Sequence, residues 1–193
     1  MNILFIDSHD FIHIALFNES KLLNEEYVYN LKDNSTVLMD TIIKVIGNNI
    51  IDLIVVVNGP GSFTGVRLGV TIAKTLAYTK KIPIKVISYL ELMKVMASAP
   101  TCTVAFPDSK GFFVAQYKNN SLVENYKYLS NSEFEVLKEE THVTTSIKFN
   151  YKLLISYIDT LTEVNPHVVN PIYIKKIDAL KWSVKQLTMN YQQ

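Results

Sequence analysis

The sequence has few of the features on which secreted, membrane-spanning and nucleic-acid-binding proteins depend. Cys102 is the only cysteine, which excludes disulfide bonds within the chain and zinc sites built from several cysteines. No apolar run approaches the roughly 20 residues that a membrane-spanning helix requires. The first residues lead straight into a strand pattern and do not resemble a signal peptide. We therefore expect a cytoplasmic protein that does not bind a membrane.

Charge of one sign is also scarce. The formal net charge of +1 gives no electrostatic field that could hold a nucleic acid. Hydrophobic residues make up 48% of the 193 residues and charged residues 19%, which are the proportions of an ordinary globular protein. A chain of this length can bury a substantial core but is too short for two full lobes. We therefore do not expect the chain to bind nucleic acid directly.

Arginine and glycine are rare, and both occur in the same region. Arg67 is the only arginine beside eighteen lysines, and three of the six glycines fall within residues 59–65, just before it. The planar guanidinium group of arginine suits two-pronged hydrogen bonding that lysine performs poorly. The sequence therefore predicts a specific partner for Arg67.

Hydrophobic patterns predict an α/β protein. Residues 2–7, 11–17 and 22–29 have strand patterns, and the short connections between them require an antiparallel meander. The following patterns predict, in order, a helix from residue 34 or 35 to 46, a buried strand over 52–57, a helix over 63–78 and a strand over 84–87. After a helix over 89–97, we predict a second, smaller sheet from 101–106, 112–117 and 122–129, and a helix over 150–161. Beyond residue 177 the pattern allows a short helix, to which we assign no role.

The glycine-rich segment connects a predicted buried strand to a predicted helix. Exposed amides at a helix N-terminus form an anion-binding arrangement in principle. The segment is not a P-loop, because Gly65 is followed by valine and Arg67, and Gly65 falls one place late for the dinucleotide-binding pattern. A structural interpretation is also open, in which glycine permits a tight turn and close backbone approach while Ser62 or Thr64 caps the helix.

The full string Gly59-Pro60-Gly61-Ser62-Phe63-Thr64-Gly65, with its continuation over residues 66–77, resembles the signature of the TsaB (YeaZ) family. Weaker similarities follow the same order along the chain, at Asp7-Ser8, Asn34-Ser35, Pro83, Asp108-Ser109-Lys110-Gly111 and Pro171-Ile172-Tyr173-Ile174-Lys175. The resemblance implies an actin/sugar-kinase/Hsp70-like (ribonuclease H-like) fold, with a mixed five-stranded sheet in its first lobe and a reduced second α/β lobe. We accordingly place the first lobe at residues 1–99 and the reduced second lobe with the C-terminal tail at 100–193.

The resemblance also implies a function. Members of this family form a heterodimer with TsaD, the related catalytic subunit, and reach the ATPase TsaE through the complex. Together these proteins transfer threonylcarbamoyl to adenosine 37 of tRNAs that read codons beginning with A. The resemblance implies that this chain activates its partner without catalytic residues of its own, and that ATP, ADP and metal are held by the partner subunits. The alternatives are a small actin-fold ATPase or phosphotransferase that uses the glycine-rich loop, and a module that exists mainly as a homodimer.

The first predicted hairpin lacks the glycine that nucleotide-binding actin-fold enzymes carry there. Its residues run from Asp7 through Ser8, His9 and Asp10, so that side chains would obstruct the approach of backbone amides to a phosphate. His9 also departs from the Asp-Thr-Ser pattern of the family. His9 and His13 would lie about 13 Å apart along a strand, too far for one ion. We predict neither a catalytic residue nor a metal site.

The two predicted helices of the first lobe are apolar over more of their surface than one core contact requires. About two thirds of the circumference of the first helix is apolar, and the second carries a stripe of small residues, Gly69, Ala73 and Ala77, that would let another helix approach closely. Either the second sheet of the chain covers both helices, or they bind an equivalent helix pair in TsaD or in a second copy of this chain. We predict the second arrangement. The predicted interface consists of Met39, Ile43, Ile46, Arg67, Val70, Thr71, Lys74 and Tyr78.

Overall fold

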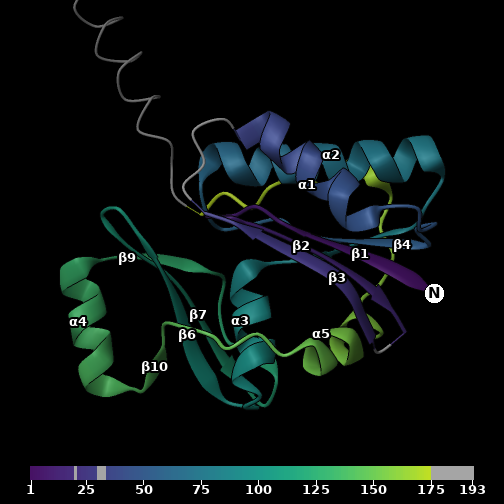
Figure 1. The fold of residues 1–193 in the computed structure, drawn as a ribbon. Coiled ribbons are helices and arrows are strands. Elements are labelled where there is room, and N and C mark those ends of the chain that lie inside the picture. Colours follow the sequence, from purple (N-terminus) through teal and green to yellow (C-terminus); the bar gives the residue numbers. More distant parts are fainter. Residues whose placement is uncertain (20, 30–33, 175–193) are drawn as a thin grey trace, which may run out of the picture.

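The structure is a computed structural model that describes residues 1–19, 21–29 and 34–174 (Figure 1). Within these ranges no helix is both long and apolar enough to cross a membrane. The short helix predicted beyond residue 177 lies outside the described residues.

The first sheet is the mixed five-stranded sheet that the sequence predicts. Its strands are β1 (Asn2–Asp7), β2 (Ile12–Asn18), β3 (Lys21–Val28), β4 (Leu53–Val57) and β5 (Ile84–Ile87), in the order β3-β2-β1-β4-β5. The first three form the predicted antiparallel meander, while β4 pairs in parallel with β1 and β5. All five residues of β4 are buried, because this strand lies between two others and is covered on both faces.

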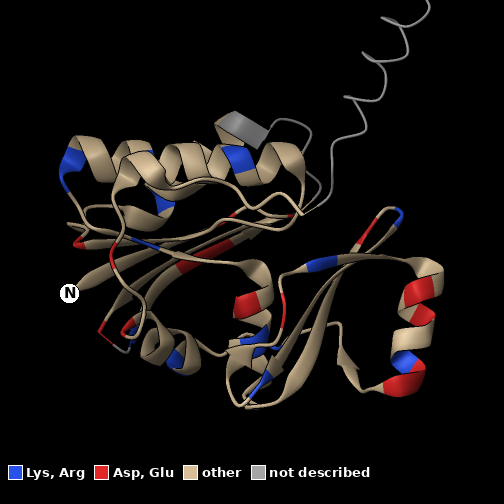
Figure 2. Ribbon diagram, turned by 180° about the vertical axis from the view of Figure 1, so that it is seen from behind, with Lys and Arg blue, Asp and Glu red and all other residues tan. Residues whose placement is uncertain are grey.

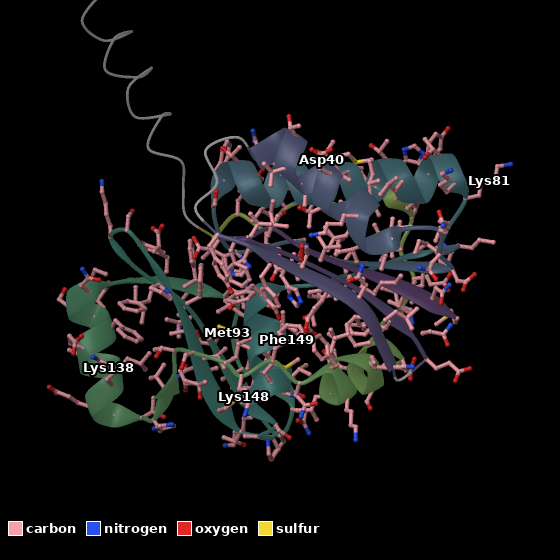
Figure 3. The ribbon with its side chains drawn as sticks, viewed as in Figure 1. Asp40, Lys81, Met93, Lys138, Lys148 and Phe149 are labelled. Atoms are coloured by element: carbon pink, nitrogen blue, oxygen red, sulfur yellow. The ribbon has the colours of Figure 1, made fainter. Side chains whose placement is uncertain are left out.

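Helices cover both faces of the first sheet. Helices α1 (Asn34–Ile46) and α2 (Phe63–Lys80) lie side by side on one face, where Leu38, Ile42 and Ala73 join one core. Helices α3 (Tyr89–Ala97) and α5 (Tyr151–Ile158) lie on the opposite face (Figure 1). Figure 3 shows Met93 of α3 and Phe149 in the space on that side. The predicted positions of α1, α2 and α3 are confirmed to within two residues.

The second sheet has five strands, two of them only two residues long. They are β6 (Cys102–Asp108), β7 (Gly111–Lys118), β8 (Ser121–Leu122), β9 (Lys127–Ser130) and β10 (Val143–Thr144). The single strand predicted over 122–129 is wrong, because β8 and β9 pair with different parts of β7 and residues 123–126 connect them outside the ladder. Helix α4 (Asn131–Glu140) follows β9 and was not predicted. Its sequence signal is a capping box between Ser130 and Glu133.

A single core joins the two sheets through α3. It includes Phe5 and Val55 from the first sheet, Met93 from α3, and Val104 and Phe113 from the second sheet. The division of the chain between residues 99 and 100 stays a prediction.

After α5 the chain returns to the first sheet. Val164 pairs with Ile84 at the edge strand β5, and a 3-10 helix over Pro166–Val168 follows. Val169 is buried in the core beneath α1 and α2, and the Ile172 amide donates a hydrogen bond to the Asn58 carbonyl over 2.8 Å. Residues 164–172 are therefore attached to the first sheet.

Candidate functional site

The glycine-rich segment forms the turn between β4 and α2. Ser62 caps α2, since its hydroxyl accepts a hydrogen bond from the Gly65 amide over 3.3 Å. Of the two predicted caps, Ser62 and Thr64, the first is confirmed. The Gly59 carbonyl accepts a hydrogen bond from the Tyr89 amide over 2.7 Å. The turn is thus attached to the start of α3 as well as to α2.

Three glycines of this region pack directly against the hairpin between β1 and β2. A Cβ atom on Gly61 would lie 2.4 Å from the His9 carbonyl oxygen, and one on Gly65 would lie 2.2 Å from the Ser8 carbonyl oxygen. A Cβ atom on Gly69 would lie 2.2 Å from Ser8 Oγ. Gly61 and Gly65 are therefore required by close backbone approach, whereas the atom nearest to Gly69 belongs to a side chain that can rotate.

Two hydrogen bonds hold the hairpin against α2. The Ser62 amide donates to the His9 carbonyl over 2.5 Å, and the buried Ser8 hydroxyl donates to the Gly65 carbonyl over 2.8 Å. The hairpin atoms closest to the motif are carbonyl oxygens, which repel a phosphate rather than bind it. Of the two interpretations of the segment, the structure supports the tight turn.

The stripe of small residues on α2 faces the interior of the protein. Gly69, Ala73 and Ala77 are all buried, and Ala73 and Ala77 belong to the core beneath the helix. The prediction that this stripe accommodates another helix is wrong, because the hairpin and the first sheet already occupy the space.

Aromatic rings fill the region between the first hairpin and the second lobe. His9 is fully buried, and its Nδ1 lies 2.7 Å from the Asp7 carboxylate. The imidazole ring stacks on Tyr89 with 3.5 Å between ring centroids, and the Phe106 ring contacts its edge. Burial raises the pKa of the Tyr89 hydroxyl, with a smaller contribution from the Asp7 charge. His9 thus helps to join the lobes at the hairpin.

His13 lies in a second aromatic cluster. It is buried, stacks on Tyr27 at 4.0 Å, and its Nε2 lies 3.6 Å from a Glu25 carboxylate oxygen. Burial lowers the pKa of His13 to about 4, with the Asp7 charge opposing and the His9 charge reinforcing the shift. Among the described residues, no three His, Cys, Asp or Glu side chains are grouped in a way that could hold a metal ion.

The outer surface of α1 and α2 is free of the second sheet. That sheet packs with α3 on the opposite face of the first sheet (Figure 1), so the alternative in which it covers both helices is excluded. Ile43 is 57% exposed and Met39 36% exposed. Figure 3 shows Asp40 on the outward side of α1. Figure 2 shows few acidic residues on this helical layer and a concentration of them on α4.

The remaining interface predictions on this layer have different environments. Thr71 is exposed, while Ile46 is partly buried against the core. Val70 is 2% exposed and packs in the core beneath α2. Its inclusion in the predicted surface needs correction, because its side chain points toward the first sheet rather than outward.

Arg67, Lys74 and Tyr78 lie along one edge of α2 and contact the returning C-terminal segment. Lys74 Nζ donates hydrogen bonds to the Val169 and His167 carbonyl oxygens over 3.0 and 3.3 Å. The Tyr78 ring meets the His167 ring edge-on at 4.9 Å.

Arg67 contacts two neighbouring aromatic residues, whose ring centroids are 5.7 Å apart. Its guanidinium carbon lies 3.8 Å from the centre of the Phe63 ring, and its Nε donates a hydrogen bond to the Tyr173 hydroxyl over 2.6 Å. Sequence reasoning did not place Tyr173 or Val168 at this surface. The only available signal was the Pro171–Lys175 similarity, which does not specify where the segment packs.

The sheet order β3-β2-β1-β4-β5, the helices on both of its faces and the second sheet define an α/β protein of the actin-like class. Residues 31–152, more than half of the chain, match the family model described as TsaD: tRNA N6-adenosine threonylcarbamoyltransferase. The chain is 39% identical over 99 residues to the tRNA threonylcarbamoyladenosine biosynthesis protein TsaB of Bacillus subtilis. That match covers 48% of this chain and 43% of the relative, so the chain matches less than half of the length of the relative.

Two solved structures from Pseudomonas aeruginosa have the same fold over nearly their whole length. One is YeaZ, with a TM-score of 0.68 and 17% identity, covering 89% of this chain and all of that chain. The other is a protein with similarity to peptidase YEAZ, with a TM-score of 0.69 and 16% identity, covering 90% of this chain and 99% of that chain. The chain belongs to the TsaB (YeaZ) family, which is distantly related to TsaD.

Proposed function

We propose that this chain is a non-catalytic subunit that binds and activates a TsaD-like catalytic subunit for tRNA modification. The reaction is the transfer of threonylcarbamoyl to adenosine 37 of tRNAs that read codons beginning with A. Family membership supports the reaction, and the name of the Bacillus subtilis relative refers to the same pathway. The chain would act in the cytoplasm, meet a TsaE-like ATPase through the complex, and contact tRNA only indirectly.

The observation that carries the proposal is the exposed apolar surface of α1 and α2. Ile43, Met39 and Tyr78 are large apolar or aromatic residues, each at least 36% exposed, on a helical layer that the second sheet leaves uncovered. Met39 and Ile43 lie one turn apart on α1, and exposed apolar side chains that adjoin in this way mark protein-binding surfaces. A helix pair on the partner would bury them by helix-on-helix packing.

The closed glycine turn supports a role without catalysis. In a nucleotide-binding relative the first hairpin would present backbone amides to phosphate, whereas here the Ser8 and His9 carbonyls face the motif. We propose that ATP, ADP and metal are bound by the partner subunits and not by this chain alone. A second copy of the chain could use the same surface when TsaD is absent, which would give a homodimer.

Reconstitution of tRNA modification tests the proposal. TsaD, TsaE, the threonylcarbamoyl donor and unmodified tRNA are combined with and without this chain, and the modified nucleoside is measured by mass spectrometry. We expect modification only when the chain is present. Equal modification without it would contradict the proposal.

Calorimetric titration of the isolated chain with ATP and magnesium separates the proposal from the phosphotransferase alternative. We expect no one-site binding. Clear binding with turnover of ATP would favour the enzyme.

A further inference from the structure

We propose that Phe63 and Tyr173 hold Arg67 as a prearranged cationic contact for a carboxylate of the partner protein. The C-terminal segment 166–173 is then part of the partner-binding surface. This inference rests on the proposed function for the identity of the partner, a TsaD-like subunit. It adds a chemically specific contact to a surface that was predicted mainly from apolar residues.

The geometry fixes the guanidinium group while leaving most of its donors available. The Phe63 ring lies against the guanidinium group, and the Tyr173 ring is 5.5 Å from the guanidinium carbon. Of the five N–H donors of an arginine, the hydrogen bond to the Tyr173 hydroxyl uses the one on Nε. Within the part of the chain that the structure describes, the two terminal amino groups retain four donors, of which a carboxylate needs two for a two-pronged contact.

Arg67 forms no ion pair with the described part of the chain. The ion pairs there involve His9, His13, Lys44, Lys127 and Lys138 as the basic partners. Phe63 and Tyr173 are 44% and 50% exposed. Their contacts with Arg67 still restrain its guanidinium group. Restraint before binding reduces the conformational entropy that a partner contact would otherwise cost.

The segment that carries Tyr173 is anchored on both sides of the exposed Val168. Lys74 donates to the carbonyl oxygens of His167 and Val169, which flank Val168, and further along the Ile172 amide donates to the Asn58 carbonyl. Val168 itself is 65% exposed. Because the segment lies along α2, its exposed residues are continuous with the predicted interface.

A protein carboxylate fits this site better than a nucleic-acid phosphate. Binding to a phosphate backbone depends on several cations acting together, whereas the net charge of the chain is +1. The nearby Lys74 already donates to two carbonyls of its own chain. Arginine and tyrosine are both enriched among the residues that contribute most to protein–protein binding, and here Arg67 and Tyr173 contact each other.

The test measures the affinity of TsaD from the same organism for five variants of the full chain, of which the fifth, Ile43→Asp, tests the proposed interface itself. Arg67→Lys keeps the charge but not the fork, and Tyr173→Phe keeps the ring but not the hydroxyl. We expect Arg67→Lys to weaken binding about ten-fold or more, and Tyr173→Phe to weaken it about three-fold, the effect of losing one hydrogen bond. The double variant should bind no more weakly than Arg67→Lys alone, because Tyr173 acts through Arg67. Lys138→Gln on α4 is the control and should bind like the unmodified chain.

The inference is overturned if Arg67→Lys binds TsaD with unchanged affinity, or if Tyr173→Phe and Arg67→Lys weaken binding additively. It is also overturned if both variants bind TsaD normally but lower the affinity of the assembled complex for tRNA, which would make RNA phosphate the target. Ile43→Asp separates this inference from the proposed function. If Ile43→Asp abolishes TsaD binding while Arg67→Lys has no effect, only the inference about Arg67 fails. If neither variant affects binding, the proposed interface fails as well.

Discussion

Replacing Gly65 by alanine tests whether the glycine-rich segment is a packing device. The new Cβ atom would lie 2.2 Å from the Ser8 carbonyl oxygen, whereas ordinary contacts begin at 3.4 Å, so the hairpin must move by 3.4 − 2.2 = 1.2 Å. Such overpacking costs about 1–3 kcal/mol. Movement of the hairpin would also weaken the Ser62–His9 and Ser8–Gly65 hydrogen bonds, each worth about 1 kcal/mol.

The better helix propensity of alanine offsets up to about 1 kcal/mol of this cost. We therefore expect Gly65→Ala to lower the free energy of unfolding by about 2–4 kcal/mol. For a protein of this size the melting temperature should fall by roughly 5–15 °C. Thermal unfolding followed by circular dichroism, together with urea titration, measures both quantities.

Gly69→Ala is the matched control. Its Cβ atom would meet the Ser8 hydroxyl oxygen, a side-chain atom that can rotate away at the loss of one hydrogen bond. That loss of about 1 kcal/mol is balanced by helix propensity, so Gly69→Ala should change stability by less than about 1 kcal/mol. In a Ser8→Ala background the nearest remaining atom is 3.5 Å away, and Gly69→Ala should become stabilising. If Gly65→Ala is as stable as Gly69→Ala, the packing explanation of the motif is wrong.

Two further predictions follow from buried or anchored groups. Burial lowers the pKa of His13 from 6.5 to about 4, so the unfolded chain binds more protons than the folded one within this window and stability falls as the pH falls through it. Between pH 7 and pH 5 the unmodified chain should lose about 2 kcal/mol more stability than the His13→Phe variant. Urea titrations at the two pH values measure this difference, and the same pH dependence in both proteins would contradict the prediction. Lys74→Met removes the hydrogen bonds to His167 and Val169 and should lower local stability by roughly 1 kcal/mol, given partial solvent exposure. Amide exchange should then be faster in residues 166–172 but not in β4, whereas equal exchange in both proteins would show that the contacts do not anchor the segment.

Local patterns were sufficient to predict much of the first lobe. The apolar run of β4, the three-strand meander and the capped start of α2 at Ser62 each depend on residues that are close in sequence. Close backbone approach at Gly61 and Gly65 was one of two interpretations of the segment, and the other was an anion-binding arrangement. The choice between them depended on Ser8 and His9, which lie more than fifty residues away.

The errors arose where distant contacts decide the structure. Val70 was predicted to belong to the interface, but it is buried because it packs with residues of the first sheet in the core beneath α2. The strand predicted over 122–129 is interrupted because its ends pair with different parts of β7. Tyr173 reaches Arg67 through a return of the chain across 106 residues, which no local pattern specifies.

The most direct test of the proposed interface is TsaD binding by the Ile43→Asp variant. Val136→Asp on α4 is the matched control, since Val136 is 55% exposed and Ile43 57% exposed, and α4 lies far from the α1–α2 layer (Figure 1). In size-exclusion chromatography with TsaD, Val136→Asp should elute as the complex and Ile43→Asp as separate proteins, with both variants folded by circular dichroism. An intact complex with Ile43→Asp would contradict the assignment of this surface.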